Sequence, residues 1–133
     1  MPMKPQFKKQ IEYEIDSWRR FIFFIQEENM LMKKRLAEII QNEKEKQLLE
    51  FIEYYQNTLI MEDNVSSLFR KDIMTHENNI EKYKSGDKQF FLEHKKLRKE
   101  IELIERFFNK LKFEFNMFVC NIMFQQKITH ISF

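Results

Sequence analysis

Two histidines and their neighbouring glutamates come nearest, by type and spacing, to a site for chemistry. His76 and His94 lie ten residues before and eight residues after Gly86, the single glycine of the chain. If Gly86 marks the turn of an antiparallel helical hairpin, both imidazoles reach nearly the same height, with Glu77 and Glu93 beside them. Such a pair can bind a transition metal or titrate near neutral pH. The alternative is that both histidines are simply tolerated at a loose, partly solvated end of a bundle.

The motifs of known catalytic sites are missing from the chain. None of the three histidines has a glutamate three residues before it, as the ferritin-like di-metal motif requires. There is also no His-Glu-x-x-His, no glycine-rich phosphate loop and no Cys-x-x-Cys. Cys120 is the single cysteine, and nothing in the sequence places His130 beside it, so we interpret it as a buried or half-buried small apolar residue. We therefore expect no catalytic residues, no bound cofactor and no enzyme activity.

The elements that position these residues are predicted to be long α-helices. Gly86 is the only glycine, and the two prolines, Pro2 and Pro5, both lie in the N-terminal tail. A fold of 133 residues that contains sheets needs many tight turns, and tight turns need Gly, Pro, Asn and Asp. We predict an all-α fold, a long antiparallel helical bundle that forms a single domain over residues 1–133, with flexible tails at 1–5 and 127–133.

Apolar residues recur at alternating spacings of four and three along three stretches, the pattern of a coiled-coil seam. The first stretch begins near Pro5 and fades at about Asn42, the second runs from about 45 to 84, and the third follows Gly86 and Asp87. The seam of the first helix includes Ile22 and Ile25, and that of the last helix includes Leu97, Ile101, Ile104 and Phe108. We expect these six side chains to be buried.

The second stretch is the least regular of the three. Glu62 and Ser66 occupy seam positions, and the apolar stripe shifts there to Met61, Val65 and Leu68. Residues 62–67 also resemble the start of a new helix, because acidic and hydroxyl side chains are common caps. The sequence thus leaves two architectures: three helices of similar length, which we favour because flush ends leave little seam exposed, or four helices.

Asn29 is the one polar residue on the seam of the first helix. A lone buried amide can set the register or the number of partners of a bundle, at some cost in stability. The alternative is that Asn29 lies at a partly exposed edge of the seam.

Large apolar side chains also occur away from the seams. If the first and last helices run parallel, Phe23 and Phe24 come near the height of Leu103 and Phe107, and the resulting patch is too large to leave in water. Either the core is wider than a two-position seam, or a partner covers the patch, which is the interpretation we favour. The interface candidates are Phe23, Phe24, Met30, Leu31, Leu103 and Phe107, and Phe113, Met117, Met123 and Phe124 also project away from the last seam.

The function expected from these features is a non-enzymatic interaction or structural module that forms a homodimer or docks on another helical protein. A ligand- or metal-sensing bundle that uses the His76/His94 end is the alternative. The net charge of +2, with both signs interspersed, gives no reason to expect nucleic acid as a partner. The apolar run Phe21–Ile25 is far shorter than the ~20 residues that span a bilayer, and one cysteine fits a reducing compartment. We expect a cytoplasmic protein without integral membrane insertion.

Overall fold

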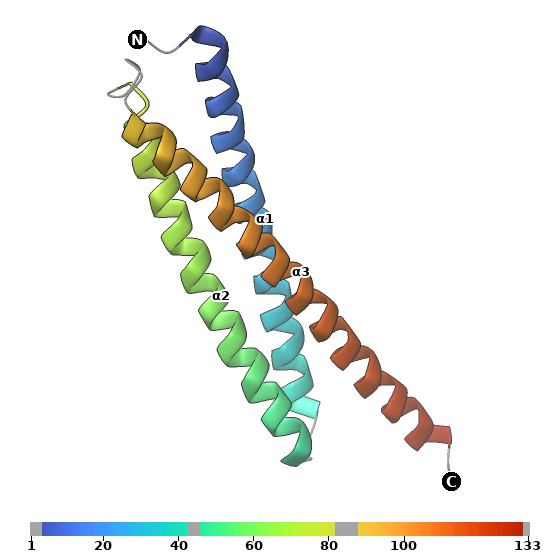
Figure 1. The fold of residues 1–133 in the computed structure, drawn as a ribbon. Coiled ribbons are helices and arrows are strands. Elements are labelled where there is room, and N and C mark those ends of the chain that lie inside the picture. Colours follow the sequence, from blue (N-terminus) through green and yellow to red (C-terminus); the bar gives the residue numbers. More distant parts are fainter. Residues whose placement is uncertain (1–3, 43–45, 82–87, 132–133) are drawn as a thin grey trace.

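The computed structural model describes residues 4–42, 46–81 and 88–131, and these residues form three long α-helices (Figure 1). The helices are α1 (Pro5–Asn42), α2 (Lys46–Asn78) and α3 (Lys88–Ile131). No strand occurs within these ranges. The predicted all-α fold is confirmed in its three-helix form, whereas coiled-coil packing of the seams stays a prediction.

Helix α2 passes through residues 62–67 without a break, so the four-helix alternative is wrong. Glu62 and Ser66 are buried on the same face as Leu59 and Phe69, so the inward face of the helix continues in register through two polar positions. The segment contains neither Gly nor Pro, and its acidic and hydroxyl residues tolerate helical geometry. The polar seam positions therefore change what the core contains and do not end the helix.

Ion pairs between the helices define the direction of each one. Residue numbers rise along α1 while they fall along α2, so these two helices are antiparallel. The pairs are Arg19–Glu77 and Lys33–Asp63, and Lys8 pairs with Glu81 just beyond the end of α2. Numbers rise together in α1 and α3, which are parallel, with the pairs Glu14–Arg98 and Glu28–Lys112. Each helix thus packs against the other two, as in an up-down-up bundle.

Helix α3 crosses the α1–α2 pair at an angle, and its C-terminal half leads away from that pair (Figure 1). Large aromatic side chains fill the widening space. The Tyr55 ring lies 5.4 Å from that of Phe115, and Phe51 lies 5.9 Å from Phe118. The Tyr55 hydroxyl donates a hydrogen bond of 3.2 Å to the carbonyl oxygen of Glu114. These contacts tie the diverging part of α3 to α2.

The helix ends agree in part with the sequence. As expected, α1 begins at Pro5, where a missing N–H costs nothing, and ends at Asn42. The predicted turn at Gly86 lies outside the described residues. Residues 127–131, which we expected to belong to a tail, are helical, because α3 runs on to Ile131 without a Gly or Pro to stop it. Over the described residues, none of the three helices has a stretch both long and apolar enough to cross a membrane.

The six side chains predicted for the core are all buried: Ile22, Ile25, Leu97, Ile101, Ile104 and Phe108. Ile104 also lines a surface groove between α2 and α3 together with its neighbour Leu103, which is exposed. A truncation at this position leaves a space that can open to solvent, and such sites lie at the low end of the range for buried aliphatic residues.

Ile104→Ala is therefore expected to lower the free energy of unfolding by about 2 kcal/mol. The matched control is Leu103→Ala on the same turn, which should change it by less than about 0.5 kcal/mol. Urea unfolding followed by circular dichroism measures both. Equal losses in the two variants would mean that the inward face of α3 has been assigned incorrectly.

Candidate functional site

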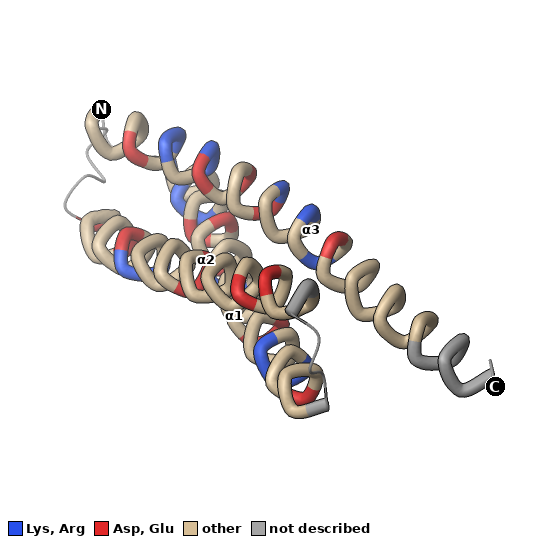
Figure 2. Tube along the Cα trace, turned by 90° about the horizontal axis from the view of Figure 1, so that it is seen from below, with Lys and Arg blue, Asp and Glu red and all other residues tan. Residues whose placement is uncertain are grey.

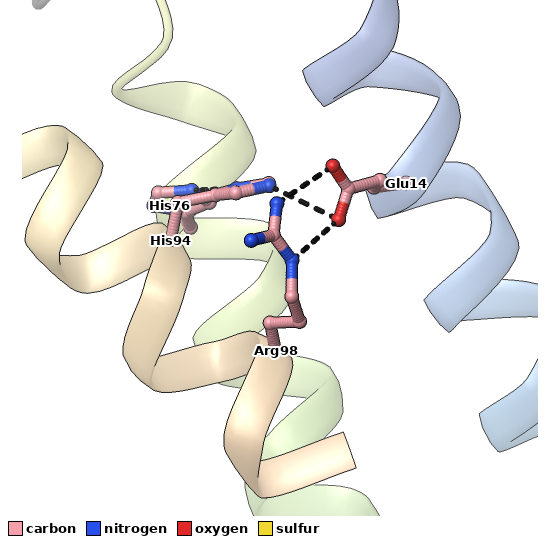
Figure 3. Close-up of polar contacts among 4 residues, drawn as sticks. All are labelled: Glu14, His76, His94 and Arg98. Atoms are coloured by element: carbon pink, nitrogen blue, oxygen red, sulfur yellow. Dashed lines mark hydrogen bonds and ion pairs between the residues drawn. The ribbon is translucent and has the colours of Figure 1, made fainter. Parts of the chain in front are cut away.

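The two histidines lie at the same height, as expected from their distances to Gly86, and they meet inside the bundle. Nε2 of His76 lies 3.0 Å from Nδ1 of His94, a hydrogen bond in which one ring nitrogen donates and the other accepts (Figure 3). Each residue is only 3% exposed, so the alternative of a partly solvated end is wrong. The ring of His76 stacks on Phe90 at 4.2 Å, and Trp18 covers His94 at 4.8 Å. Aromatic contacts thus hold both imidazoles in place.

A carboxylate from α1 and a guanidinium from α3 complete this cluster (Figure 3). Nε and Nη2 of Arg98 donate hydrogen bonds of 2.9 Å to the two carboxylate oxygens of Glu14. The same carboxylate lies 3.6 Å from Nε2 of His94, a distance too long for a hydrogen bond. The pairing of Glu14 with Arg98 was not predicted. The two residues lie 84 positions apart, and nothing in the sequence indicates that they meet.

Burial decides the protonation of the histidines. It lowers the pKa of His76 to about 4, and the neighbouring His94 adds to that effect. Burial also lowers the pKa of His94, which the negative charge of Glu14 only partly opposes. Burial alone would raise the pKa of Glu14, but the hydrogen bonds from Arg98 hold it below its usual value. At neutral pH the cluster therefore holds two neutral imidazoles beside a closed ion pair.

The two glutamates that we expected beside the histidines differ in their surroundings. Glu77 accepts a hydrogen bond of 2.6 Å from Arg19. Glu93 lines a pocket of about 240 Å³ that opens beside His76, together with Asp72, Thr75, Asn79, Gln89 and Phe90. In the part of the chain that the structure describes, no group of three or more His, Cys, Asp or Glu side chains could hold a metal ion. The geometry therefore brings the two histidines together, pairs Glu77 with α1 and leaves Glu93 at the pocket beside His76.

A buried polar layer lies further along α1 and α2. Asn29 is fully buried, which excludes the alternative of an exposed seam edge, and its Nδ2 donates to Oδ1 of Asp63 at 3.2 Å. Lys33 pairs with the same carboxylate. Among the residues that the structure describes, none makes a hydrogen bond to Oδ1 of Asn29, Oε1 of Glu62 or Oγ of Ser66. A register-setting role for Asn29 remains a prediction, and the unpaired oxygens indicate a layer that costs stability.

Glu62 is the most perturbed acid of this layer. It is 2% exposed, and burial raises its pKa to about 7, with a further contribution from the negative charge of Asp63. A carboxylic acid in such a place holds its proton near neutral pH. The sequence signal was present, because Glu62 occupies a seam position, but we interpreted it as an interruption of the apolar seam and not as a buried acid.

The six interface candidates are exposed, yet they do not form one patch. Successive residues of a helix point about 100° apart, so Phe23 and Met30 share one flank of α1, and Phe24 and Leu31 share another. The ring of Phe24 packs edge-on against Phe108 of α3 at 5.9 Å, so it takes part in contacts within the chain. The expected surface is therefore divided over the bundle.

Leu103 and Phe107 lie on a different side from Phe24. Leu103 lines the groove between α2 and α3 with Val65 and Leu68, the outward residues that accompany the buried Glu62 and Ser66. Phe107 follows one turn later on α3 and is also exposed. The parallel register of α1 and α3 brings Leu103 and Phe107 near the height of Phe23 and Phe24. Heptad positions give no direction to residues off the seam, and burial of these residues by a partner stays a prediction.

The longest outward apolar row on α3 is formed by Phe113, Met117, Cys120 and Phe124. Phe113 is 67%, Met117 48% and Phe124 64% exposed. Cys120 is exposed as well, so our interpretation of it as buried or half-buried is wrong. The surrounding residues 115–126 contain no charged side chain, and the C-terminal part of α3 before its grey end carries no charge colour in Figure 2. We call these four residues the outer row of α3.

Comparison with known protein families, with curated proteins and with solved structures finds no match to this chain.

Proposed function

We propose that this chain is a non-enzymatic helical module whose function is to associate with another helical chain, in the first place with a second copy of itself. The observation that carries the proposal is the outer row of α3. Its large apolar side chains are exposed on a helix face that lacks charge, while the opposite face of the same segment, with Phe115 and Ile122, is buried. A helix that is apolar on both faces is normally covered on both.

The other candidate surfaces support association less well. On α1, the apolar pairs Phe23/Met30 and Phe24/Leu31 alternate with charged residues, among them Glu27 and Glu28. Scattered exposed apolar residues of this kind are ordinary on soluble helices. The outer row differs from them because none of its four successive members carries a charge.

The test is the oligomeric state of the purified protein, measured by light scattering over a range of concentrations. We expect a particle with twice the mass of one chain. Phe113→Glu should dissociate it while the circular-dichroism spectrum stays helical, because the new charge would be buried without a partner in the contact. The matched control is Phe23→Glu on α1, another exposed phenylalanine, which should remain dimeric.

Two outcomes would refute the proposal. One is a wild-type chain that stays monomeric at the highest concentration measured. The other is dissociation by Phe23→Glu and not by Phe113→Glu, which would move the contact from α3 to α1.

A further inference from the structure

We infer that two copies pair through α3 in antiparallel orientation, around a two-fold axis that lies between Met117 and Cys120. In this arrangement Phe113 meets Phe124 of the second copy, and Met117 meets Cys120 of the second copy. The inference rests on the proposed self-association and adds to it the orientation, the register and the contacting residues.

The spacing of the outer row is that of a second heptad seam. Its four positions are separated by four, three and four residues, the same alternation that forms the inner seam of the bundle. They lie on the opposite side of α3 from Phe115 and Ile122, which are buried. A helix can therefore pack on the outer row without displacing any contact within the chain.

A two-fold axis requires that each residue of the contact meets its partner reciprocally. A heptad seam has two kinds of position, one followed by a step of three residues and one followed by a step of four. In antiparallel helix pairs, each kind faces the other. The row satisfies this condition: Phe113 with Phe124 and Met117 with Cys120 are both matches between the two kinds of position. The small Cys120 faces the long, flexible Met117, and a thioether side chain adapts well to such a space.

Charge separates the antiparallel orientation from the parallel one. Towards the N-terminus, the outer row is continued at heptad spacing by Lys110, Arg106, Leu103 and Lys99. A parallel pair would set each of the three cations against its own copy, and like charges across a helix contact are destabilising. The antiparallel pair moves each of these cations away from its counterpart in the second copy.

The same basic side chains indicate that the apolar part of the outer row ends near Phe113. Arg106 and Lys110 make no ion pair with any residue in the described ranges, and both are exposed. In the antiparallel arrangement, Arg106 lies two positions of the row beyond Phe113, outside the contact between Phe113 and Phe124. The apolar contact is thereby confined to the uncharged segment of α3 that Figure 2 shows.

The native cysteine makes the register testable by disulfide formation. Met117→Cys would place a thiol opposite Cys120 of the second copy, at a separation that a disulfide can bridge. Under mild oxidation, this variant should convert to covalent dimers at least tenfold faster than the wild type, as seen on non-reducing gels. The matched control is Lys110→Cys, which is one heptad away on the same row and should not react faster than the wild type.

Spin labels give a second reading that does not depend on disulfide chemistry. Lys99→Cys combined with Cys120→Ala carries one label at an exposed position. At 1.5 Å per residue, the antiparallel register places the two labels about 60 Å apart, whereas a parallel pair would hold them within about 20 Å. Pulsed electron resonance on the dimer distinguishes these two distances.

The possible results separate the inference from the function on which it rests. A monomeric wild type overturns both. A wild-type dimer with labels within about 20 Å, or with Lys110→Cys reacting as fast as Met117→Cys, keeps the self-association and overturns the antiparallel register. A dimer with distant labels and rapid reaction of Met117→Cys is the result we expect.

Discussion

Glu62→Gln should stabilise the folded chain by about 3 kcal/mol above pH 7, and this gain should vanish near pH 4. Glu62 is buried, its Oε1 has no hydrogen-bond partner, and its pKa in the folded chain is raised to about 7 from an ordinary value of 4.5. Between these two values, the folded chain holds a proton that the unfolded chain releases. Stability is therefore fully present below pH 4.5 and is lost as the pH rises through 7.

Glutamine resembles the protonated acid in shape and carries no charge at any pH. The substitution therefore removes the cost of ionising a buried carboxyl and leaves the packing of the layer unchanged. Its amide also offers donors to a layer in which Oδ1 of Asn29 and Oγ of Ser66 lack partners. Such a donor can only increase the gain.

The measurement is urea unfolding of the wild type and of Glu62→Gln at pH 8 and at pH 4. The control is Glu53→Gln, an exposed glutamate on the same helix, which should change stability little at either pH. A gain of equal size at both pH values would show that packing and not ionisation is responsible. A loss at pH 8 would show that the buried carboxylate is paired in solution.

The helices could be predicted from the sequence because their cause is local. Heptad spacing and the near absence of glycine and proline act along one segment at a time, and burial of the six core residues follows from the same periodicity. Glu62 and Ser66 show where that reasoning stops. A polar residue at a seam position has two possible results, an interrupted helix or a polar core, and the choice depends on what the facing helix offers. Here Asn29 of α1 lies in the same layer.

The candidate sites also contain features that follow from local spacing and features that depend on how the helices pack. The meeting of His76 and His94 could be predicted, because two adjacent helices of known spacing fix the height of each ring. Glu14 could not, because it comes from α1, whose rotation relative to α3 is set by packing. The extent of the apolar surface could not be predicted for a related reason: Phe23 and Phe24 are neighbours in sequence but diverge by about 100° on a helix. Phe113 and Phe124 share a face of α3, because the members of their row are separated by steps of four, three and four residues.

Acid should destabilise the bundle through the histidine pair, and the effect should become visible once Glu62 is replaced. In Glu62→Gln, lowering the pH from 7 to 4 is expected to reduce the free energy of unfolding by about 3 kcal/mol. His76 has a pKa of about 4 in the folded chain against an ordinary value of 6.5, because burial disfavours its charged form. Between these values, the unfolded chain binds the proton that the folded chain excludes. Stability is present above pH 6.5 and is lost on acidification.

The charged groups that face the pair do not cancel this effect. Glu14 of α1 favours a charged His94, but its carboxylate already accepts two hydrogen bonds from Arg98 of α3, whose positive charge acts in the opposite direction. Burial lowers the pKa of His94 as well, so both imidazoles contribute with the same sign. Protonation of both rings would also break their mutual hydrogen bond, since neither could then accept.

In the wild type, Glu62 and His76 have opposite slopes over nearly the same range of pH, so apart from the contribution of His94 its stability should vary little between pH 4.5 and 6.5. In Glu62→Gln, the free energy of unfolding should fall on acidification, because only the histidine effect remains. In His76→Gln, it should rise on acidification, because the effect of Glu62 remains. The double variant should again vary little, apart from the contribution of His94. Urea unfolding of all four proteins across this range measures the slopes. A wild type that loses stability in acid as steeply as Glu62→Gln would show that Glu62 is ionised in the folded chain. A double variant as steep as Glu62→Gln would assign the acid effect to groups other than His76.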